Sequence, residues 1–107
     1  MPDTVRTAQT FLERLFAGEY ARATESFAPN MRAAVTDASL AKLWERIGTL
    51  FGKPIRHSGT RTAKTISSTV EIIYLSWDFE RERLDTRVVV DSSNQIAGIS
   101  FETPVIK

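Results

Sequence analysis

The 107-residue chain has no cysteine, one histidine and no long apolar run. Without cysteine it can form no disulfide, no thiolate zinc site and no cysteine nucleophile. A single histidine disfavours zinc chemistry, and no spacing of carboxylates suggests another metal, so the sequence predicts neither a metal nor a cofactor. The sequence also lacks a glycine-rich phosphate loop and a G-x-S-x-G motif, which disfavours nucleotide hydrolysis and serine hydrolysis.

An excess of charge of either sign is missing as well. The chain has 14 basic and 13 acidic residues and a formal net charge of +1, so no long-range field attracts nucleic acid or an anionic membrane. The polar N-terminus does not resemble a signal peptide, and no stretch approaches the roughly 18 apolar residues of a membrane span. We therefore expect a cytoplasmic protein with neither a nucleic-acid nor a membrane partner.

What the chain has is the composition of one globular domain. Its residues are 42% hydrophobic and 25% charged, and its length falls within the usual size of a single domain. Because there is no internal repeat and no linker-like stretch, residues 1–107 are predicted to form one domain with one core.

The first half of the sequence has helical periodicity. Apolar residues recur at intervals of three and four over residues 4–17 and again over residues 37–51, which predicts two amphipathic helices. A shorter helix is predicted over residues 19–27, ended by Pro29. Residues 30–35 have too few apolar positions to decide for a helix, and they are predicted to be mostly irregular.

The second half has the period of strands. β-branched and aromatic residues dominate residues 68–79, and further strands are predicted over residues 84–90 and 95–101, separated by short polar turns. A less apolar, more basic strand over residues 55–62 is predicted to form a protected edge. Helices followed by a meander of four strands predict an α+β fold, with N-terminal helices packed on a four-stranded antiparallel sheet.

The strand over residues 68–79 is apolar on both faces. Its apolar residues fall on both parities: Val70, Ile72 and Tyr74 on one, Ile73, Leu75, Trp77 and Phe79 on the other. Helices of this length cover only one face of a four-stranded sheet, so the other face requires a second chain or a strongly rolled sheet. We therefore expect a homodimer formed through the sheet face.

Hydrophobic and turn positions along most of the chain are similar to those of a known superfamily. They are Phe11 through Gly18, Tyr20, Phe27, Met31, Leu40, Trp44 and Gly52, followed by residues 88–91 and 96–101. With these landmarks the chain resembles the nuclear transport factor 2-like superfamily, and more narrowly a bacterial domain of unknown function found alone or ahead of α/β-hydrolase domains. The resemblance implies a cystatin-like cone in which helices cover a curved sheet, and it carries over no catalytic residue.

Large amphipathic side chains are the candidate ligand contacts. Tyr20, Trp44, Tyr74 and Trp77 combine a broad apolar ring with a polar tip, which suits a pocket that orients an apolar ligand; core packing explains them equally well. An imidazole is a common general acid or base and a common polar contact in binding sites. His57 therefore completes the candidate ligand-binding set, and its alternative is an ordinary place on a polar edge strand. No residue is assigned as catalytic.

Two further groups have both a functional and a structural interpretation. At the mouth of an apolar cone Asp78 would have a raised pKa and be a candidate acid or base, whereas a place beside the charged turn makes it a solvated surface group. The basic residues of the edge strand favour protection against aggregation over phosphate binding, and they are Lys53, Arg56, Arg61 and Lys64.

The sequence favours a non-catalytic binding or interaction module, with a small apolar ligand held between the long helix and the concave sheet. Aromatic residues are plentiful, and groups suited to catalysis are few. One alternative is a small isomerase, dehydratase or cyclase in which Asp78 or His57 moves a proton. Another is an accessory domain that partners a hydrolase.

Overall fold

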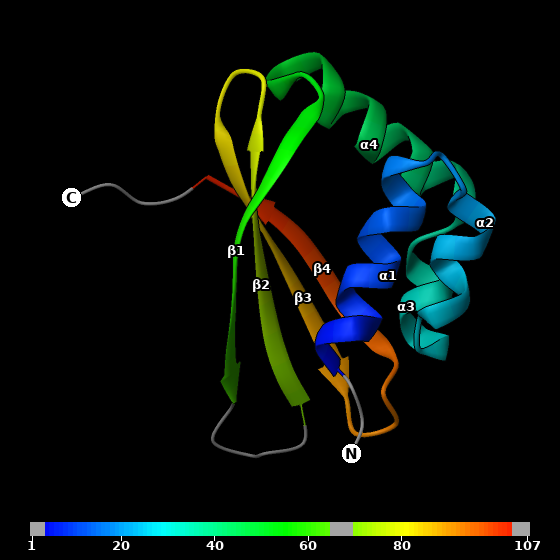
Figure 1. The fold of residues 1–107 in the computed structure, drawn as a ribbon. Helices are drawn as coiled ribbons and strands as arrows, with labels where there is room; N and C mark the ends of the chain where they lie inside the picture. The colour runs from blue at the N-terminus through cyan, green and yellow to red at the C-terminus, as the bar shows by residue number, and fades with distance from the viewer. Residues whose placement is uncertain (1–3, 65–69, 104–107) are drawn as a thin grey trace.

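A computed structural model of the chain describes residues 4–64 and 70–103. Its helices come first and its strands second, and the helices lie together on one side of the sheet (Figure 1). The helical elements are α1 (Thr4–Phe16), α2 (Tyr20–Ala23), the 3₁₀ helix η1 (Thr24–Ser26), α3 (Pro29–Ala34) and α4 (Asp37–Phe51), and the strands are β1 (Pro54–Lys64), β2 (Val70–Phe79), β3 (Arg83–Asp91) and β4 (Ile96–Glu102). The α+β fold predicted from the sequence is confirmed.

The first helix, α1, forms because its apolar residues fall on one face. Ala8, Phe11, Leu12 and Leu15 are all buried, and their spacing is that of a single helical stripe. The chain turns away at Gly18, whose φ of 78° lies in the left-handed region that glycine adopts at little cost.

The segment between α1 and α4 departs from the prediction. The helix expected over residues 19–27 is divided into α2 and η1, and Phe27 is extended and makes a parallel bridge with Ile96 of β4. Residues 30–35, predicted to be mostly irregular, lie largely within α3. That prediction was wrong because it weighed apolar spacing alone, whereas Pro29 presets the first helical turn and the alanines that follow favour helix.

The long helix, α4, begins with a capping box. The Thr36 hydroxyl accepts a hydrogen bond from the Ser39 amide at 3.2 Å, and the Ser39 hydroxyl accepts one from the Thr36 amide at 2.8 Å. These two bonds satisfy amides that would otherwise lack partners at the helix start. Along its length the helix buries Leu40 and Ile47 against the sheet side of the molecule.

The end of α4 is tied to the turn between β2 and β3. Glu80 Oε1 accepts a hydrogen bond from the Lys53 amide at 2.8 Å, and the Arg81 guanidinium donates to the Thr49 carbonyl at 3.0 Å. Gly52 lies between these contacts with a φ of 84°, and a Cβ added there would come within 2.6 Å of Glu80 Oε1. The close approach of the two segments therefore requires glycine at position 52.

The four described strands form an antiparallel meander in the order β1-β2-β3-β4. Each strand therefore pairs with its neighbour in the sequence, and β1 and β4 are the edges. The register places Leu75 of β2 beside Thr60 of β1 and Thr86 of β3, so these three side chains share one face. The edge strand predicted over residues 55–62 is confirmed, and it carries two irregularities of register.

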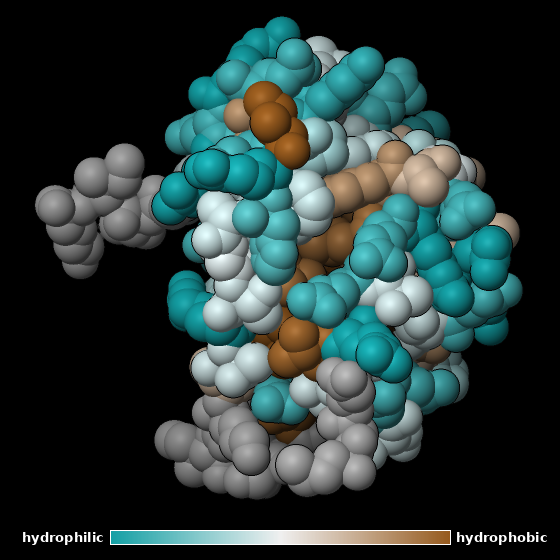
Figure 2. All heavy atoms as spheres, viewed as in Figure 1, coloured by the Kyte–Doolittle hydropathy of each residue, from teal (hydrophilic) through white to brown (hydrophobic). Residues whose placement is uncertain are grey.

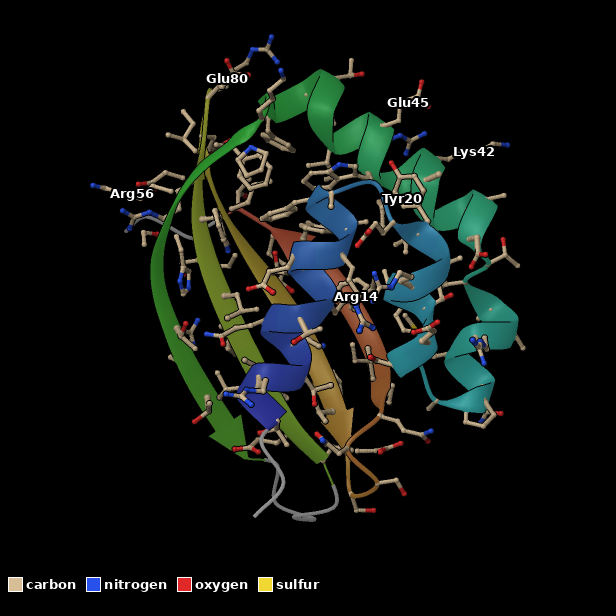
Figure 3. All side chains as sticks on the ribbon, turned by 45° about the vertical axis from the view of Figure 1, so that its right-hand side comes forward. Arg14, Tyr20, Lys42, Glu45, Arg56 and Glu80 are labelled. Atoms are coloured by element: carbon tan, nitrogen blue, oxygen red, sulfur yellow. The ribbon has the colours of Figure 1, made fainter. Side chains whose placement is uncertain are left out.

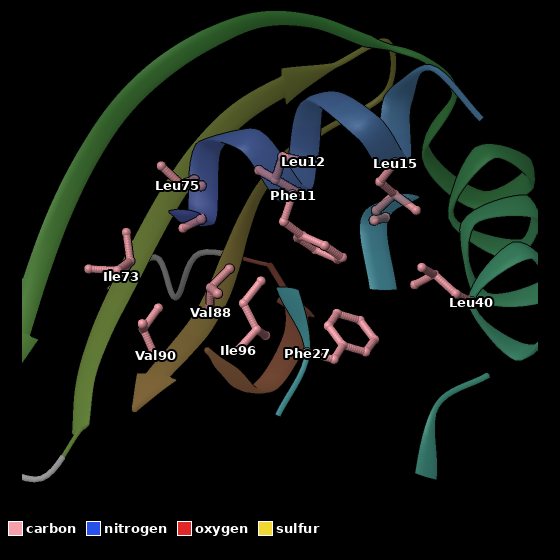
Figure 4. Packing of buried hydrophobic residues seen from close by; sticks show 12 residues of the cluster. Phe11, Leu12, Leu15, Phe27, Leu40, Ile73, Leu75, Val88, Val90 and Ile96 are labelled. Carbon is pink, nitrogen blue, oxygen red and sulfur yellow. The ribbon is translucent and has the colours of Figure 1, made fainter. Parts of the chain in front are cut away.

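The sheet curves around α1, and its inner face, the one that meets the helices, carries the core (Figure 4). Alternate residues of the two central strands are buried there: Ile73, Leu75, Phe79, Leu84, Thr86, Val88 and Val90. The opposite parity, which we call the outer face, is only partly buried. The alternation predicted to be missing is thus present in burial, although the sequence is apolar on both parities.

Candidate functional site

Four rings form a continuous row from α4 to β1. Trp44 stacks on Phe16 with ring centroids 4.9 Å apart, and Phe16 meets Trp77 edge to face at 4.9 Å. Trp77 in turn stacks against His57, with centroids 5.4 Å apart. We call these four residues the aromatic row. Stacked and edge-to-face contacts of this kind are favourable between aromatic rings. Through them the row connects α4, α1, β2 and β1 in that order.

The fold brings these rings together from distant parts of the sequence. Phe16 is the last residue of α1, and Trp44 lies on the half-buried stripe of α4. Trp77 and His57 are register partners in β2 and β1. Because partners in an antiparallel pair point to the same face, the register carries His57 to the inner face beside Trp77.

A hollow opens at the β1 end of the aromatic row. It has a volume of about 190 Å³ and is lined by Gln9, Leu12, Glu13, His57, Leu75 and Trp77. Leu12 and Leu75 are buried and form an apolar floor, whereas Glu13 and His57 are exposed. We call it the His57 hollow. Figure 2 shows hydrophobic side chains at the bottom of the gap between polar rims on this face of the molecule.

A second hollow lies at the α4 end of the row. Its volume is about 440 Å³, and it is lined by Phe16, Trp44, Gly48, Gly52, Lys53 and Pro54. Gly48 leaves it open, because a Cβ added to that residue would meet no atom within 4 Å. The Lys53 ammonium has no ion-pair partner within residues 4–64 and 70–103. We call it the Lys53 hollow.

One ring nitrogen of His57, Nε2, is within hydrogen-bond distance of other groups of the described chain. Its Nε2 lies 2.8 Å from the Gly59 carbonyl oxygen and 2.9 Å from the Thr60 hydroxyl. A carbonyl only accepts, so Nε2 carries the proton and donates it there. In the neutral ring Nδ1 is then an acceptor, with no partner in the described part of the chain.

The two candidate tyrosines lie away from the hollows. Tyr20 is half-buried on α2 and packs against the core on the α4 side of α1 (Figure 3). Tyr74 lies on the outer face, where the Arg61 guanidinium stands 3.9 Å over its ring centre in a cation–π contact. Of the five predicted ligand contacts, the structure therefore brings Trp44, His57 and Trp77 together in the aromatic row.

Asp78 does not face the helices. It lies on the outer face and pairs with Arg83 Nε and Arg56 Nη2, each at 3.0 Å. The Arg83 guanidinium, followed by that of Arg56, holds the pKa of this carboxyl below its ordinary value of 3.8. The interpretation of Asp78 as an acid or base with a raised pKa is thus wrong, since two cations surround it on the other side of the sheet. Its other interpretation, a surface group beside the charged turn, agrees with this place.

The basic residues of β1, and Lys53 directly before it, serve separate contacts. Arg56 pairs with Asp78 and points away from the helices (Figure 3), Arg61 covers Tyr74, and Lys53 lines its hollow. The side chain of Lys64 lies outside the described residues. The described side chains therefore form no common phosphate-facing patch.

The outer face keeps an apolar centre. Val70, Ile72, Tyr74 and Val89 are half-buried there, and no element of the described chain packs over them, since all helices lie on the opposite side (Figure 1). The polar end of the same face holds a hydrogen bond of 2.6 Å from the Ser76 hydroxyl to Asp85.

Several residues that line the hollows were not predicted. Phe16 was assigned to the helix face alone, and Lys53 was noted only as a member of the basic stretch. Gln9, Glu13 and Gly48 carried no signal of their own. The one signal in the sequence was the position of Phe16 at the end of a predicted helix, two residues before Gly18, where a side chain lies at the edge of the core. The others become neighbours through tertiary packing, which single-sequence periodicity does not contain.

The comparison with protein families gives a match over most of the chain. A family model described as a protein of unknown function (DUF3887) matches residues 8–99. The chain belongs to the DUF3887 family. No curated protein and no solved structure matches the chain.

The DUF3887 domain shows two further features within residues 4–64 and 70–103. No helix there has the length and hydrophobicity needed to cross a membrane. In the same residues, no three His, Asp or Glu side chains gather into a group that could hold a metal ion.

Proposed function

We propose that this DUF3887 domain is a non-catalytic binding module that holds a small, largely apolar ligand along the aromatic row. One observation carries the proposal: the two hollows flank the same line of rings, and Phe16 and Trp77, which line one hollow each, are in contact. Pockets with apolar walls and a few polar groups are the usual form of small-molecule sites.

The expected affinity is modest. A ligand that removes about 150 Å² of apolar surface from water gains roughly 4 kcal/mol, which corresponds to a dissociation constant near 1 mM before polar contacts are added. Screening therefore requires ligand concentrations in the millimolar range.

Intrinsic fluorescence offers a direct test of binding. The chain has two tryptophans, and both belong to the aromatic row, so an apolar ligand in either hollow should change their emission. Titration of the wild type with cyclohexanol and with cyclopentanol, which do not fluoresce, should give a saturable change and raise the melting temperature. If neither molecule alters emission or melting temperature at millimolar concentration, the proposed binding function is wrong.

A blocking variant locates the site. Gly48→Leu places a side chain in the Lys53 hollow, where its Cβ would meet no atom within 4 Å. Leucine also favours helix more than glycine does, so the fold should be kept while binding at that hollow is lost. Thr49→Leu is the matched control, because Thr49 is the next residue of α4 and does not line the hollow. Equal binding by both variants would place the ligand elsewhere.

A proton-transfer enzyme is the second candidate, and one observation favours it. His57 and Glu13 line the same hollow, so a substrate there would meet an imidazole and a carboxylate together. An enzyme of this kind would convert a substrate that a binding module leaves unchanged, and its turnover would be lost in His57→Gln. The accessory role beside a hydrolase stays a prediction from the sequence.

We also propose that a second copy of the chain covers the outer face. The half-buried residues Val70, Ile72, Tyr74 and Val89 form its apolar centre, and Arg87 and Asp85 supply charges of both signs, as a self-complementary two-fold interface requires. Light scattering after size exclusion at micromolar concentration should give a dimer. Ile72→Lys should yield a monomer, while Ala21→Lys on exposed α2 should not; a monomeric wild type would end this proposal.

A further inference from the structure

We infer that the His57 hollow selects a compact organic cation, an apolar body that carries a protonated amine. The inference rests on the proposed binding function and adds the chemical class of ligand for one of its two hollows. It follows from the charge of the lining, from the hydrogen-bonding roles of its polar groups, and from its size.

The lining carries one fixed charge, and it is negative. The Glu13 carboxylate borders the hollow, and the described residues around it include neither lysine nor arginine. Within residues 4–64 and 70–103 the Glu13 side chain makes no ion pair or hydrogen bond. An anionic ligand would thus meet an uncompensated carboxylate, whereas a cation would supply its missing partner.

The uncharged polar groups of the hollow, His57 and Gln9, also favour a ligand that donates hydrogen bonds. Because His57 donates from Nε2 to the Gly59 carbonyl, the neutral ring offers only the acceptor Nδ1 to another molecule. Gln9 adds an amide that can accept as well, and its side chain makes no hydrogen bond within the described chain. An ammonium group has three donors and no acceptor, so it matches this set.

The apolar floor of the hollow and its volume determine the character and the size of the rest of the ligand. Leu12, Leu75 and the half-buried Trp77 form an apolar surface, which suits an apolar body behind the ammonium group. At about 190 Å³ the hollow is smaller than the roughly 300 Å³ at which sites for drug-sized ligands begin. The ligand is therefore a fragment-sized amine. The Lys53 hollow, whose ammonium has no ion-pair partner among the described residues, has the opposite charge at its rim.

A matched series of probes tests the charge preference. Benzylamine, benzyl alcohol and benzoate share one ring and differ in charge, and each is titrated at neutral pH into the ¹⁵N-labelled protein. Binding is measured from chemical-shift changes at Gln9, Glu13 and His57, which separate this hollow from the one at Lys53. We expect benzylamine to bind about fivefold more tightly than benzyl alcohol, the effect of one partly exposed charge pair, and benzoate to bind more weakly than both.

Two variants assign the effect to one carboxylate. Glu13→Gln removes the charge at an exposed position and keeps the shape of the side chain, so it should reduce the preference for benzylamine over benzyl alcohol to about one. Glu45→Gln removes a carboxylate from the outer side of α4 (Figure 3) and should leave the preference unchanged.

The outcomes separate this inference from the proposed function. If benzyl alcohol binds in the hollow and benzylamine binds no better, or if Glu13→Gln keeps the preference, the cation selectivity is wrong and the binding function stands. If none of the three probes shifts these resonances while cyclohexanol changes the tryptophan emission, the His57 hollow is not a ligand site. If no probe binds anywhere, both proposals fail.

Discussion

The two ends of the hydrophobic core differ in how completely they are filled. Under the middle of α1 the core is closed: Phe11, Leu15, Ile73 and Val88 have no exposed surface. Along the aromatic row the core is built largely from half-buried rings, and a hollow opens at each end of the row, the Lys53 hollow beside α4 and the His57 hollow beside β1. The comparison indicates that the closed end supplies most of the stability, whereas the open end keeps apolar surface available to another molecule.

The largest predicted effect is at the closed end. Phe11→Ala should lower the free energy of unfolding by about 4 kcal/mol, because it removes a fully buried ring and leaves a cavity. The half-buried Phe101 at the open end provides the comparison, and Phe101→Ala should cost about half as much. Urea denaturation followed by circular dichroism measures both. Equal losses would mean that the two ends are packed alike.

Two glycines of the open end should respond in opposite directions. Gly52→Ala should cost about 2 kcal/mol, since alanine is strained at a φ of 84° and its Cβ would collide with Glu80. Gly48→Ala should instead add about 0.5 to 1 kcal/mol, because the helical position has room for a methyl group. The same denaturation curves measure both changes. A stabilising Gly52→Ala would show that the tie between α4 and the β2–β3 turn is loose.

A smaller effect on stability is expected at the start of α4, which lies toward the closed end of the core. Thr36→Ala removes the hydroxyl that accepts from the Ser39 amide and should cost about 1 kcal/mol. Thr36→Ser keeps the acceptor and should cost much less. If the two substitutions destabilise equally, the cap does not anchor the helix.

The smallest effect concerns the outer face at the open end. Because the folded pKa of Asp78 is lowered, its ionised form stabilises the fold above its ordinary pKa, and that stability is lost as the pH falls through the folded value. The stability difference between wild type and Asp78→Asn should therefore be present at pH 6 and shrink as the pH falls below the ordinary value of 3.8 and through the lowered folded pKa. Arg83→Gln should weaken the pH dependence. If the stability difference between wild type and Asp78→Asn does not change with pH, it arises from packing and not from the charge of Asp78.

Much of the fold could be predicted from the sequence because its signals are local. The stripe of α4, its stop at Gly52, and the change to strand period all depend on neighbouring residues. The prediction failed at α3, where short helices depend on Pro29 and alanine more than on apolar spacing. The alternation of side chains along a strand also predicted that Tyr74 and Trp77 lie on opposite faces of β2, and the structure places them so.

The candidate site was less predictable because it depends on the path of β1. The aromatic nature of Trp44 and Trp77 marked them, yet only the register of β1 against β2 sets His57 beside Trp77. Glu13 and Lys53 are ordinary surface charges in the sequence, and their role follows from the hollows that they border. The sign of the pKa shift of Asp78 likewise depended on two arginines 22 residues before it and five after it.

The pairing of each strand with its neighbour in the sequence has a consequence for how the protein is made. A ribosome produces the helices first, and α1 must wait for β2 and β3 before its apolar side is covered. The sheet can then grow quickly, one hairpin after another, because each loop that it closes is short. We therefore expect the nascent chain to be most prone to misassociation just before β3 emerges, and chaperone contact during synthesis to concentrate in that interval.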